Sequence, residues 1–197
     1  MNLTTRSTNR QVRRPDLNRL AKAFAQAVST HQYRKFSLQL NTTEEVLRRL
    51  GVGVATADEL SRHGGWAQGW SDDANCLMVI PERDADLNVV GLSLRDEAGR
   101  PGGIGQRGLT VPVDISDSPD PVLVVDGIHD VAACLTLGLT AIGCPVKKRA
   151  IADLGRLVEG REAIVIGSSG PNAWRLQALA GLGLDVTPVS RRNADPG

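Results

Sequence analysis

Uninterrupted apolar runs alternate with helical patterns in the second half of the chain. Four short apolar segments predict strands, at 122–125, 140–142, 163–166 and 185–189. Segments with helical spacing separate them, one ending at Gly138 and two near 149–158 and 172–182. Because apolar runs without alternation are typical of strands buried on both faces, and short crossovers are local and right-handed, this order predicts a parallel sheet with flanking helices.

The first half of the chain has a different pattern. Residues 16–30 carry apolar side chains at helical spacing, and 36–53 is typical of two short helices joined by a polar turn. Antiparallel β-structure follows, and we expect a hairpin of 76–80 and 89–95 around a turn at 84–88, then a Gly-rich turn region at 96–105 and a third strand at 109–113. These elements predict a small α+β subdomain.

The patterns divide the chain into parts. We expect a disordered basic tail at 1–14, a helical and β-hairpin subdomain at 15–115, an α/β domain at 119–190 and a disordered tail at 191–197, with SDSPDP at 116–121 as the linker. The predicted fold class is therefore α/β. It consists of a four-stranded, mainly parallel sheet with flanking helices, preceded by a small α+β subdomain that contains a β-hairpin.

Two acids follow the first strand of the α/β domain. Asp126 and Gly127 end the run VLVV, and Asp130 stands on the first turn of the next helix. Both carboxylates are expected at the carboxyl edge of the sheet, where open α/β folds bind ligands and where carboxylate oxygens suit Mg²⁺. Alternatively, Asp130 caps the helix and Asp126 ties down the turn. His129 is expected to be exposed, or else to titrate beside the acids.

The strand, the acid-Gly-x-x-Asp motif and the helix resemble the first motif of the Toprim domain, which topoisomerases and bacterial-type primases share. Asp126 stands where that family has Glu, and Gly127 and Asp130 match. The segment 76–112 resembles the part ahead of the Toprim domain in phage- and plasmid-type primase-helicase proteins. The resemblance covers about 38–190. If the protein is active, the resemblance implies Mg²⁺-dependent phosphoryl or nucleotidyl transfer.

The second Toprim motif, Asp-x-Asp after an apolar strand, is degenerate in this sequence. Ser168 and Gly170 occupy its two aspartate positions, so a neutral hydroxyl and a residue without a side chain replace two carboxylates. The resemblance leaves Asp126 and Asp130 as the catalytic and metal-binding residues, and it implies that Mg²⁺ is bound weakly or not at all and that catalysis is lost. The carboxylates that would otherwise rebuild the site are Asp72, Asp73 and Asp153.

The loop after the third strand supports two alternatives. Gly167, Ser168, Ser169 and Gly170 are small residues between a strand and a helix, and such a loop can cradle phosphate through backbone N–H groups. A small nucleotide- or phosphate-binding α/β protein is the first alternative. A non-catalytic protein-interaction module, derived from a mobile-element replication protein, is the second.

Positive charge is concentrated near the N-terminus. Residues 1–50 hold ten Lys or Arg against three Asp or Glu, hence +7, whereas the whole chain carries +1. This asymmetry suggests an anionic partner, and we expect nucleic acid, with DNA favoured. The residues expected to contact it are Lys147, Lys148 and Arg149 after the second strand, and Arg48 and Arg49 in the helical hairpin. A packing role is the alternative for the hairpin, and the resemblance implies a separate helicase or replication protein as partner.

Composition limits the class of protein. Hydrophobic residues make up 41% and charged residues 23% of the 197, which is typical of a globular protein. No apolar run reaches the ~18 residues of a membrane span, and the N-terminus has no signal-like apolar core. Cys76, Cys134 and Cys144 are too widely spaced for a zinc site or disulfide framework. We therefore expect a cytoplasmic protein with no membrane association.

Overall fold

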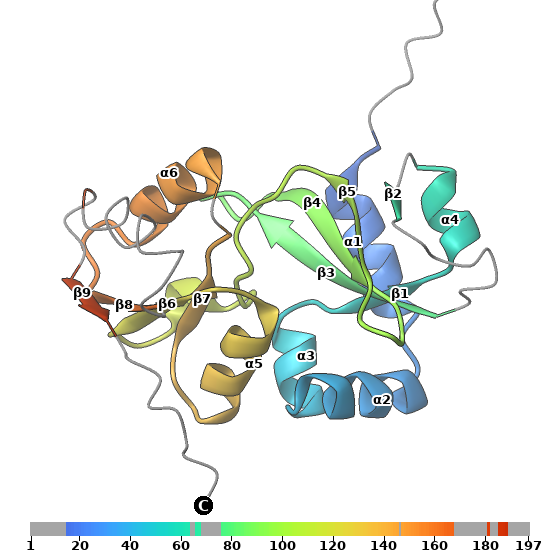
Figure 1. Ribbon diagram of the computed structural model, residues 1–197, viewed down its shortest axis with the longest axis horizontal. Helices are drawn as coiled ribbons and strands as arrows, with labels where there is room; N and C mark the ends of the chain where they lie inside the picture. The colour runs from blue at the N-terminus through green and yellow to red at the C-terminus, as the bar shows by residue number, and fades with distance from the viewer. Residues whose placement is uncertain are drawn as a thin grey trace, which may run out of the picture.

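The computed structural model describes residues 15–63, 66–67, 76–145, 147–167, 181 and 185–188. Within these ranges the first half of the chain forms a five-stranded antiparallel sheet and the second half a four-stranded parallel sheet (Figure 1). The expected α/β class is confirmed. The tails predicted at 1–14 and 191–197 lie outside the described residues. None of the described helices combines the length and apolar character that crossing a membrane requires.

The N-terminal helices begin at side-chain caps. They are α1 Leu17–Gln26, α2 Thr30–Leu40, α3 Glu44–Arg49 and α4 Ala57–Ser61. The prediction of one helix over 16–30 is wrong, because Ser29 starts a new one. Its hydroxyl accepts from the Gln32 backbone N–H while the Gln32 side chain accepts from the Ser29 N–H, which is a capping box. Asn41, in the left-handed region, then turns the chain from α2 into α3.

The antiparallel sheet has the order β1-β3-β4-β5-β2. Its strands are β1 Gly53–Ala55, β2 Trp66–Ala67, β3 Leu77–Arg83, β4 Val89–Arg95 and β5 Pro101–Gly105. The predicted hairpin is confirmed as β3 paired with β4. The prediction of a turn over the whole of 96–105 is wrong, because β5 completes the sheet there. Glycine and proline are depleted in strands, so the sequence PGGIG does not indicate that β5 is a strand.

The segment expected as a third strand at 109–113 is not a strand. It forms isolated bridges, from Leu109 to Arg83 in the antiparallel sheet and from Thr110 to Gly143 in the parallel one. A short 3-10 helix, Ile115–Asp117, follows it. Leu109, Val111 and Ile115 of this connecting segment are buried in the core of the parallel half. The prediction is wrong because the segment makes only one isolated bridge to each sheet, and its apolar residues pack in the core of the parallel half.

The parallel sheet has the order β7-β6-β8-β9. Its strands are β6 Val122–Val125, β7 Ala141–Gly143, β8 Ala163–Gly167 and β9 Asp185–Pro188. All three neighbouring pairs are parallel, so the four predicted strands are confirmed. Two helices, α5 Ile128–Thr136 and α6 Lys148–Leu157, cover opposite faces of this sheet (Figure 1). The helix predicted at 172–182 falls almost wholly outside the described residues.

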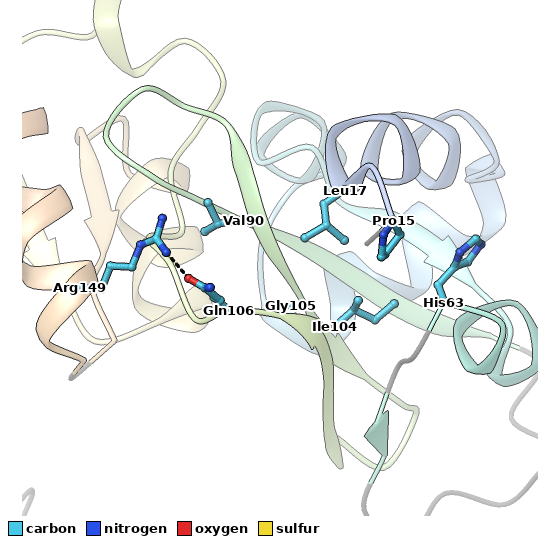
Figure 2. Close-up of a pocket in the computed structure, with 8 residues that line it drawn as sticks. All are labelled: Pro15, Leu17, His63, Val90, Ile104, Gly105, Gln106 and Arg149. Carbon is cyan, nitrogen blue, oxygen red and sulfur yellow. Dashed lines mark hydrogen bonds between the residues drawn. The ribbon is translucent and has the colours of Figure 1, made fainter. Parts of the chain in front are cut away.

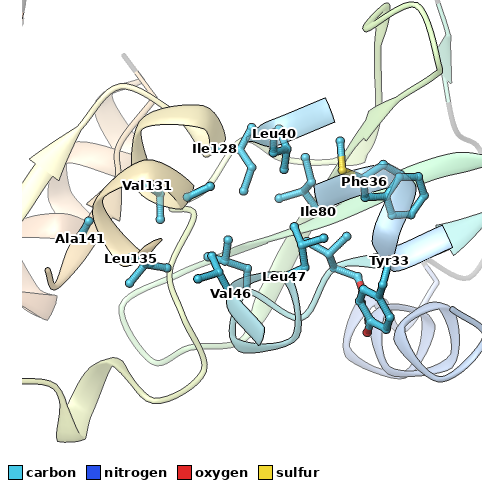
Figure 3. Packing of buried hydrophobic residues seen from close by; sticks show 14 of the residues in the cluster. Tyr33, Phe36, Leu40, Val46, Leu47, Ile80, Ile128, Val131, Leu135 and Ala141 are labelled. Atoms are coloured by element: carbon cyan, nitrogen blue, oxygen red, sulfur yellow. Dashed lines mark hydrogen bonds between the residues drawn. The ribbon is translucent and has the colours of Figure 1, made fainter. Parts of the chain in front are cut away.

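One apolar cluster joins the two halves of the molecule. Phe36 and Leu47, from α2 and α3, are buried in the same cluster as Val131 and Leu135 of α5 (Figure 3). The hydroxyls of Thr42 and Thr136 add a hydrogen bond of 2.6 Å across the same contact. Burial of this much apolar surface stabilises the arrangement and fixes the parallel sheet against the antiparallel one.

Candidate nucleic-acid interface and acidic edge

The two acids of the first motif lie where β6 passes into α5. Asp126 follows β6, Gly127 is the N-cap of α5 and Asp130 lies in its first turn. Asp126, His129 and Asp130 are all exposed. The cap position makes no side-chain hydrogen bond, although the Asp130 charge suits the N-terminus of a helix. Because β6 lies between β7 and β8, these acids are central on the carboxyl edge of the sheet.

The metal-binding prediction rests on two carboxylates. Among the described residues, no group of three or more His, Cys, Asp or Glu is arranged to hold a metal ion. Asp153 is buried on α6 and its carboxylate lies 3.8 Å from the Arg149 Nε and 3.9 Å from the Arg156 Nη1, so its nearest charges belong to its own helix. The other candidate ligands, Asp72 and Asp73, lie outside the described residues, as do Ser168, Ser169 and Gly170 of the loop that follows Gly167.

At Gly143 the connecting segment contacts the carboxyl edge of the parallel sheet, where Asp126 and Asp130 lie. Thr110 and Gly143 exchange two backbone hydrogen bonds of 2.9 Å. A Cβ on Gly143 would lie 2.9 Å from the Val131 side chain and 3.4 Å from the Gly127 Cα, so only glycine fits without displacement. The end of β7, the start of α5 and the connecting segment therefore meet beside Asp126.

The predicted basic run starts α6. Lys147 is the N-cap, and Lys147, Lys148 and Arg149 are exposed. The Arg149 guanidinium donates a hydrogen bond to the Gln106 side-chain oxygen, which places the start of α6 beside the loop after β5 (Figure 2). Cations at a helix N-terminus oppose the helix dipole, so this placement has an electrostatic cost that an anionic ligand would offset.

A buried carboxylate anchors a second cation next to this loop. Glu82 on β3 is 1% exposed, and its Oε1 lies 3.0 Å from the Nη2 of Arg107. The Gly108 N–H donates to Glu82 Oε2 at 2.9 Å, and the Arg107 Nη1 donates to the Ser93 hydroxyl at 2.6 Å. Arg107 itself is exposed. The sequence reasoning missed this cluster, although a Glu inside the apolar run LMVIPER was a signal for it.

Arg95 on β4 belongs to the same electrostatic cluster. Burial lowers its pKa, and repulsion from Arg107 lowers it further, while Glu82 raises it. Two arginines therefore share one buried carboxylate. The positive charge that Glu82 does not neutralise is available to an anion at the exposed Arg107.

The pKa of Glu82 gives a testable pH dependence. Burial raises this pKa above 4.5, although Arg107, Ser93 and Gly108 partly oppose the rise. When the pKa of a group is higher in the folded state than in the unfolded state, its stabilising contribution is complete at pH values below the unfolded-state pKa. This contribution is lost as the pH rises through the folded-state pKa. We expect Glu82→Gln to remove this loss, so its free energy of unfolding should fall less than that of the wild type between acidic and neutral pH. Urea unfolding at several pH values measures this, and parallel profiles would contradict it.

A hollow of about 520 Å³ lies against the antiparallel sheet, next to the contact between Arg149 and Gln106. Arg149 and Gln106 lie at one end, His63 lies at the other, and the apolar side chains between them include Leu17 and Ile104 (Figure 2). Only glycine fits at position 105 in the wall of the hollow, because its φ is +77° and a Cβ there would lie 2.5 Å from the Val90 carbonyl oxygen. The hollow therefore has a cation at one end and a lining that is partly polar and partly apolar.

The arginines of the helical hairpin have intramolecular partners. Arg48 lies over the Tyr33 ring, 4.5 Å from its centroid, and pairs with Glu44 at 3.1 Å. Arg49 binds both carboxylate oxygens of Asp114, at 2.9 and 3.3 Å. The apolar side of α3 packs in the cluster that joins the two halves. These contacts favour the packing alternative for the hairpin, and nucleic-acid contact by Arg48 and Arg49 stays a prediction.

The fold is similar to that of bacterial primase catalytic cores. The Escherichia coli primase catalytic core matches with a TM-score of 0.62 and 17% identity, over 91% of this chain and 71% of that one. The RNA polymerase domain of Mycobacterium tuberculosis primase DnaG, in complex with double-stranded DNA, matches with 0.58 and 19% identity, over 90% and 72%. The primase fragment of the bacteriophage T7 primase-helicase protein matches with 0.54 and 14%, over 77% and 62%. By sequence, no known protein family and no curated protein matches.

Proposed function

We propose that this protein associates with nucleic acid as a primase-type, Toprim-like protein whose metal site is degenerate. The observation that carries the proposal is the contact between Arg149 and Gln106. It sets the basic start of α6 beside the loop that carries the exposed Arg107, and we infer that these cations contact one ligand. Phosphates along a nucleic acid backbone match such a row of exposed cations.

The similar solved structures support the same function. One of them holds double-stranded DNA, another is a DnaG primase catalytic domain bound to single-stranded DNA, and a third comes from a primase-helicase protein. In the proposed complex, Lys147, Lys148, Arg149 and Arg107 contact backbone phosphates, and the hollow beyond Gln106 accommodates the adjoining strand. A replication helicase in a separate chain is the protein partner that we propose.

The proposed chemistry at the acidic edge is limited. Asp126 and Asp130 supply two carboxylates among the described residues, which fits a weakly held Mg²⁺ but not the pair of ions used in two-metal phosphoryl transfer. We therefore propose binding without strand cleavage or primer synthesis, and we assign no catalytic step to these residues.

Magnesium affinity tests the degenerate site. We expect calorimetric titration to give a dissociation constant in the millimolar range or no binding, because two exposed carboxylates hold a strongly hydrated ion poorly. Restoring the Toprim pattern with Asp126→Glu, Ser168→Asp and Gly170→Asp should raise the affinity. A micromolar constant for the unaltered protein would show that further ligands complete the site, and the degenerate-site proposal would fail.

Direct binding tests the proposed association with nucleic acid. Fluorescence anisotropy with labelled single- and double-stranded DNA, in buffers of increasing salt, should show affinity that falls steeply with salt, since each neutralised phosphate releases counterions. Binding to neither DNA at low salt would leave the protein-interaction module as the better account.

A further inference from the structure

A second cavity lies on the other side of the β3–β4 hairpin from the cluster of Glu82, Arg95 and Arg107. It measures about 280 Å³ and is lined by residues of α1, the loop before β1, the β3–β4 hairpin and the connecting segment. The lining consists of Asn18, Ala21, Lys22, Ala25, Gly51, Pro81, Arg83, Val89 and Val113. It includes two cations, Lys22 and Arg83, and no carboxylate. The rest of the lining is mostly apolar, so an anion in the cavity would meet these two cations without a competing carboxylate.

Arg83 is an incompletely satisfied cation at this cavity. Its Nη1 donates to the Leu87 carbonyl at 2.9 Å, while its Nε is buried and has no hydrogen-bond partner. The salt bridges within the described part of the chain do not include Arg83. The neighbouring Asp84 forms no ion pair with Arg83 among the described residues, and its Oδ1 accepts from the backbone N–H groups of Asp86 and Asn88. A half-buried charge without an ionic partner carries a desolvation cost.

The cavity offers room for a group that would reduce this desolvation cost. Burial lowers the pKa of this guanidinium, with no opposing contribution from a carboxylate. Its Nη2 lies 3.5 Å from the position that a Cβ on Gly51 would take, and Gly51 has a φ of +68°, where glycine is favoured. The absence of a side chain at Gly51 therefore keeps space beside Nη2.

Two groups on α1 complete the set of donors. Lys22 stands one helical turn after Asn18, so both side chains lie on the side of α1 that faces the cavity. The Asn18 oxygen accepts from the Val89 N–H at 2.9 Å, which fixes the amide against β4. A guanidinium, an ammonium and an amide thus surround a space without carboxylates.

We propose that this cavity is a binding site for a phosphate group, held between Arg83 and Lys22. A tetrahedral oxyanion accepts charge-assisted hydrogen bonds from both cations, and these are stronger than neutral ones. It would also provide the counter-charge that the described residues do not give Arg83. Inorganic phosphate and a nucleic acid phosphate share this chemistry. The site is separate from the Arg107 cluster and does not depend on the function proposed above.

Titration of the full chain with inorganic phosphate tests this site. We expect saturable, millimolar binding by calorimetry, with amide chemical-shift changes centred on Gly51 and Arg83 in NMR spectra. Lys22→Gln removes one ionic partner from an exposed position, so the fold should persist while phosphate affinity falls about three- to tenfold. Arg83→Gln should weaken binding further. The matched control is Arg34→Gln, an exposed cation on α2, which should leave affinity unchanged.

A second titration, with single-stranded DNA in phosphate-free buffer, identifies the source of the phosphate. If Lys22→Gln weakens both phosphate and DNA binding, the site holds a backbone phosphate. If it weakens phosphate alone, the site serves a free phosphate or nucleotide. The proposal is overturned if the wild type shows no saturable phosphate binding, or if Lys22→Gln and Arg34→Gln bind phosphate equally. Failure of DNA binding with intact phosphate binding would count against the proposed function alone.

Discussion

Replacing Lys147, Lys148 and Arg149 by Ala should make DNA binding less dependent on salt. The slope of the logarithm of the binding constant against the logarithm of the salt concentration should become less steep by about two to three units, because each phosphate contact on duplex DNA contributes about 0.9. The same change should lower affinity by about 10²-fold near 0.1 M salt, where counterion release contributes strongly. All sequences should be affected alike, since backbone contacts carry no base information. Anisotropy titrations at four or five salt concentrations supply both quantities.

A control within the same helix makes this result specific. Arg156 is an exposed cation in the last turn of α6, where it pairs with Asp86 at 2.9 Å. Arg156→Ala should leave the slope unchanged within error. If the triple variant also leaves slope and affinity unchanged, the carboxyl edge of the sheet is not a nucleic-acid surface.

Arg107→Gln tests whether the antiparallel half contributes to the same surface. It should reduce the slope by about one unit and add to the effect of the triple variant, because Arg107 is a separate contact. It also removes the main charge opposing the desolvation of Glu82, so stability at neutral pH must be checked first by urea unfolding. A slope change in the triple variant but none in Arg107→Gln would confine the interface to α6.

Local sequence patterns predicted the parallel half of the fold well. The apolar runs at 122–125 and 163–166 form adjacent parallel strands whose side chains are all buried or half-buried, so their pattern and their structure correspond directly. The acids at 126 and 130 and the cations at 147–149 then follow from a topological rule, because the carboxyl ends of parallel strands lie on one edge. The position of these charged side chains at one edge of the sheet could be predicted from the sequence. The molecules that they bind could not.

The structure of the antiparallel half could not be predicted fully from local sequence patterns, because it depends on contacts between distant parts of the chain. Strand β5 has the sequence PGGIG and is held by pairing with β4 and β2, so tertiary contacts override a weak propensity. The connecting segment has strand-like alternation, yet it makes only isolated bridges to the two sheets and packs in the core of the parallel half. The Glu82–Arg107 pair joins residues 25 positions apart through a loop whose path only the folded structure defines.

The junction between the halves supports a prediction about cooperativity. Leu47 on α3 is fully buried in the cluster that includes Val131 and Leu135 of α5. Leu47→Ala should lower the free energy of unfolding by about 2–5 kcal/mol, through lost transfer energy and the cavity left behind. Leu38→Ala, on the neighbouring helix, is the matched control. Leu38 is 80% exposed, so its truncation should change stability by less than about 0.5 kcal/mol.

Amide hydrogen exchange then shows whether the junction makes the two sheets one cooperative unit. Strand β3 belongs to the antiparallel sheet and β8 to the parallel one, and the shared cluster contains side chains from both sides of the junction. We therefore expect Leu47→Ala to reduce the protection of the most stable amides in β3 and β8 by the same free energy, because both then exchange through global unfolding. Loss of protection in β3 with β8 unchanged would mean that the halves unfold independently, and that the nucleic-acid surface is assembled from two separately stable parts.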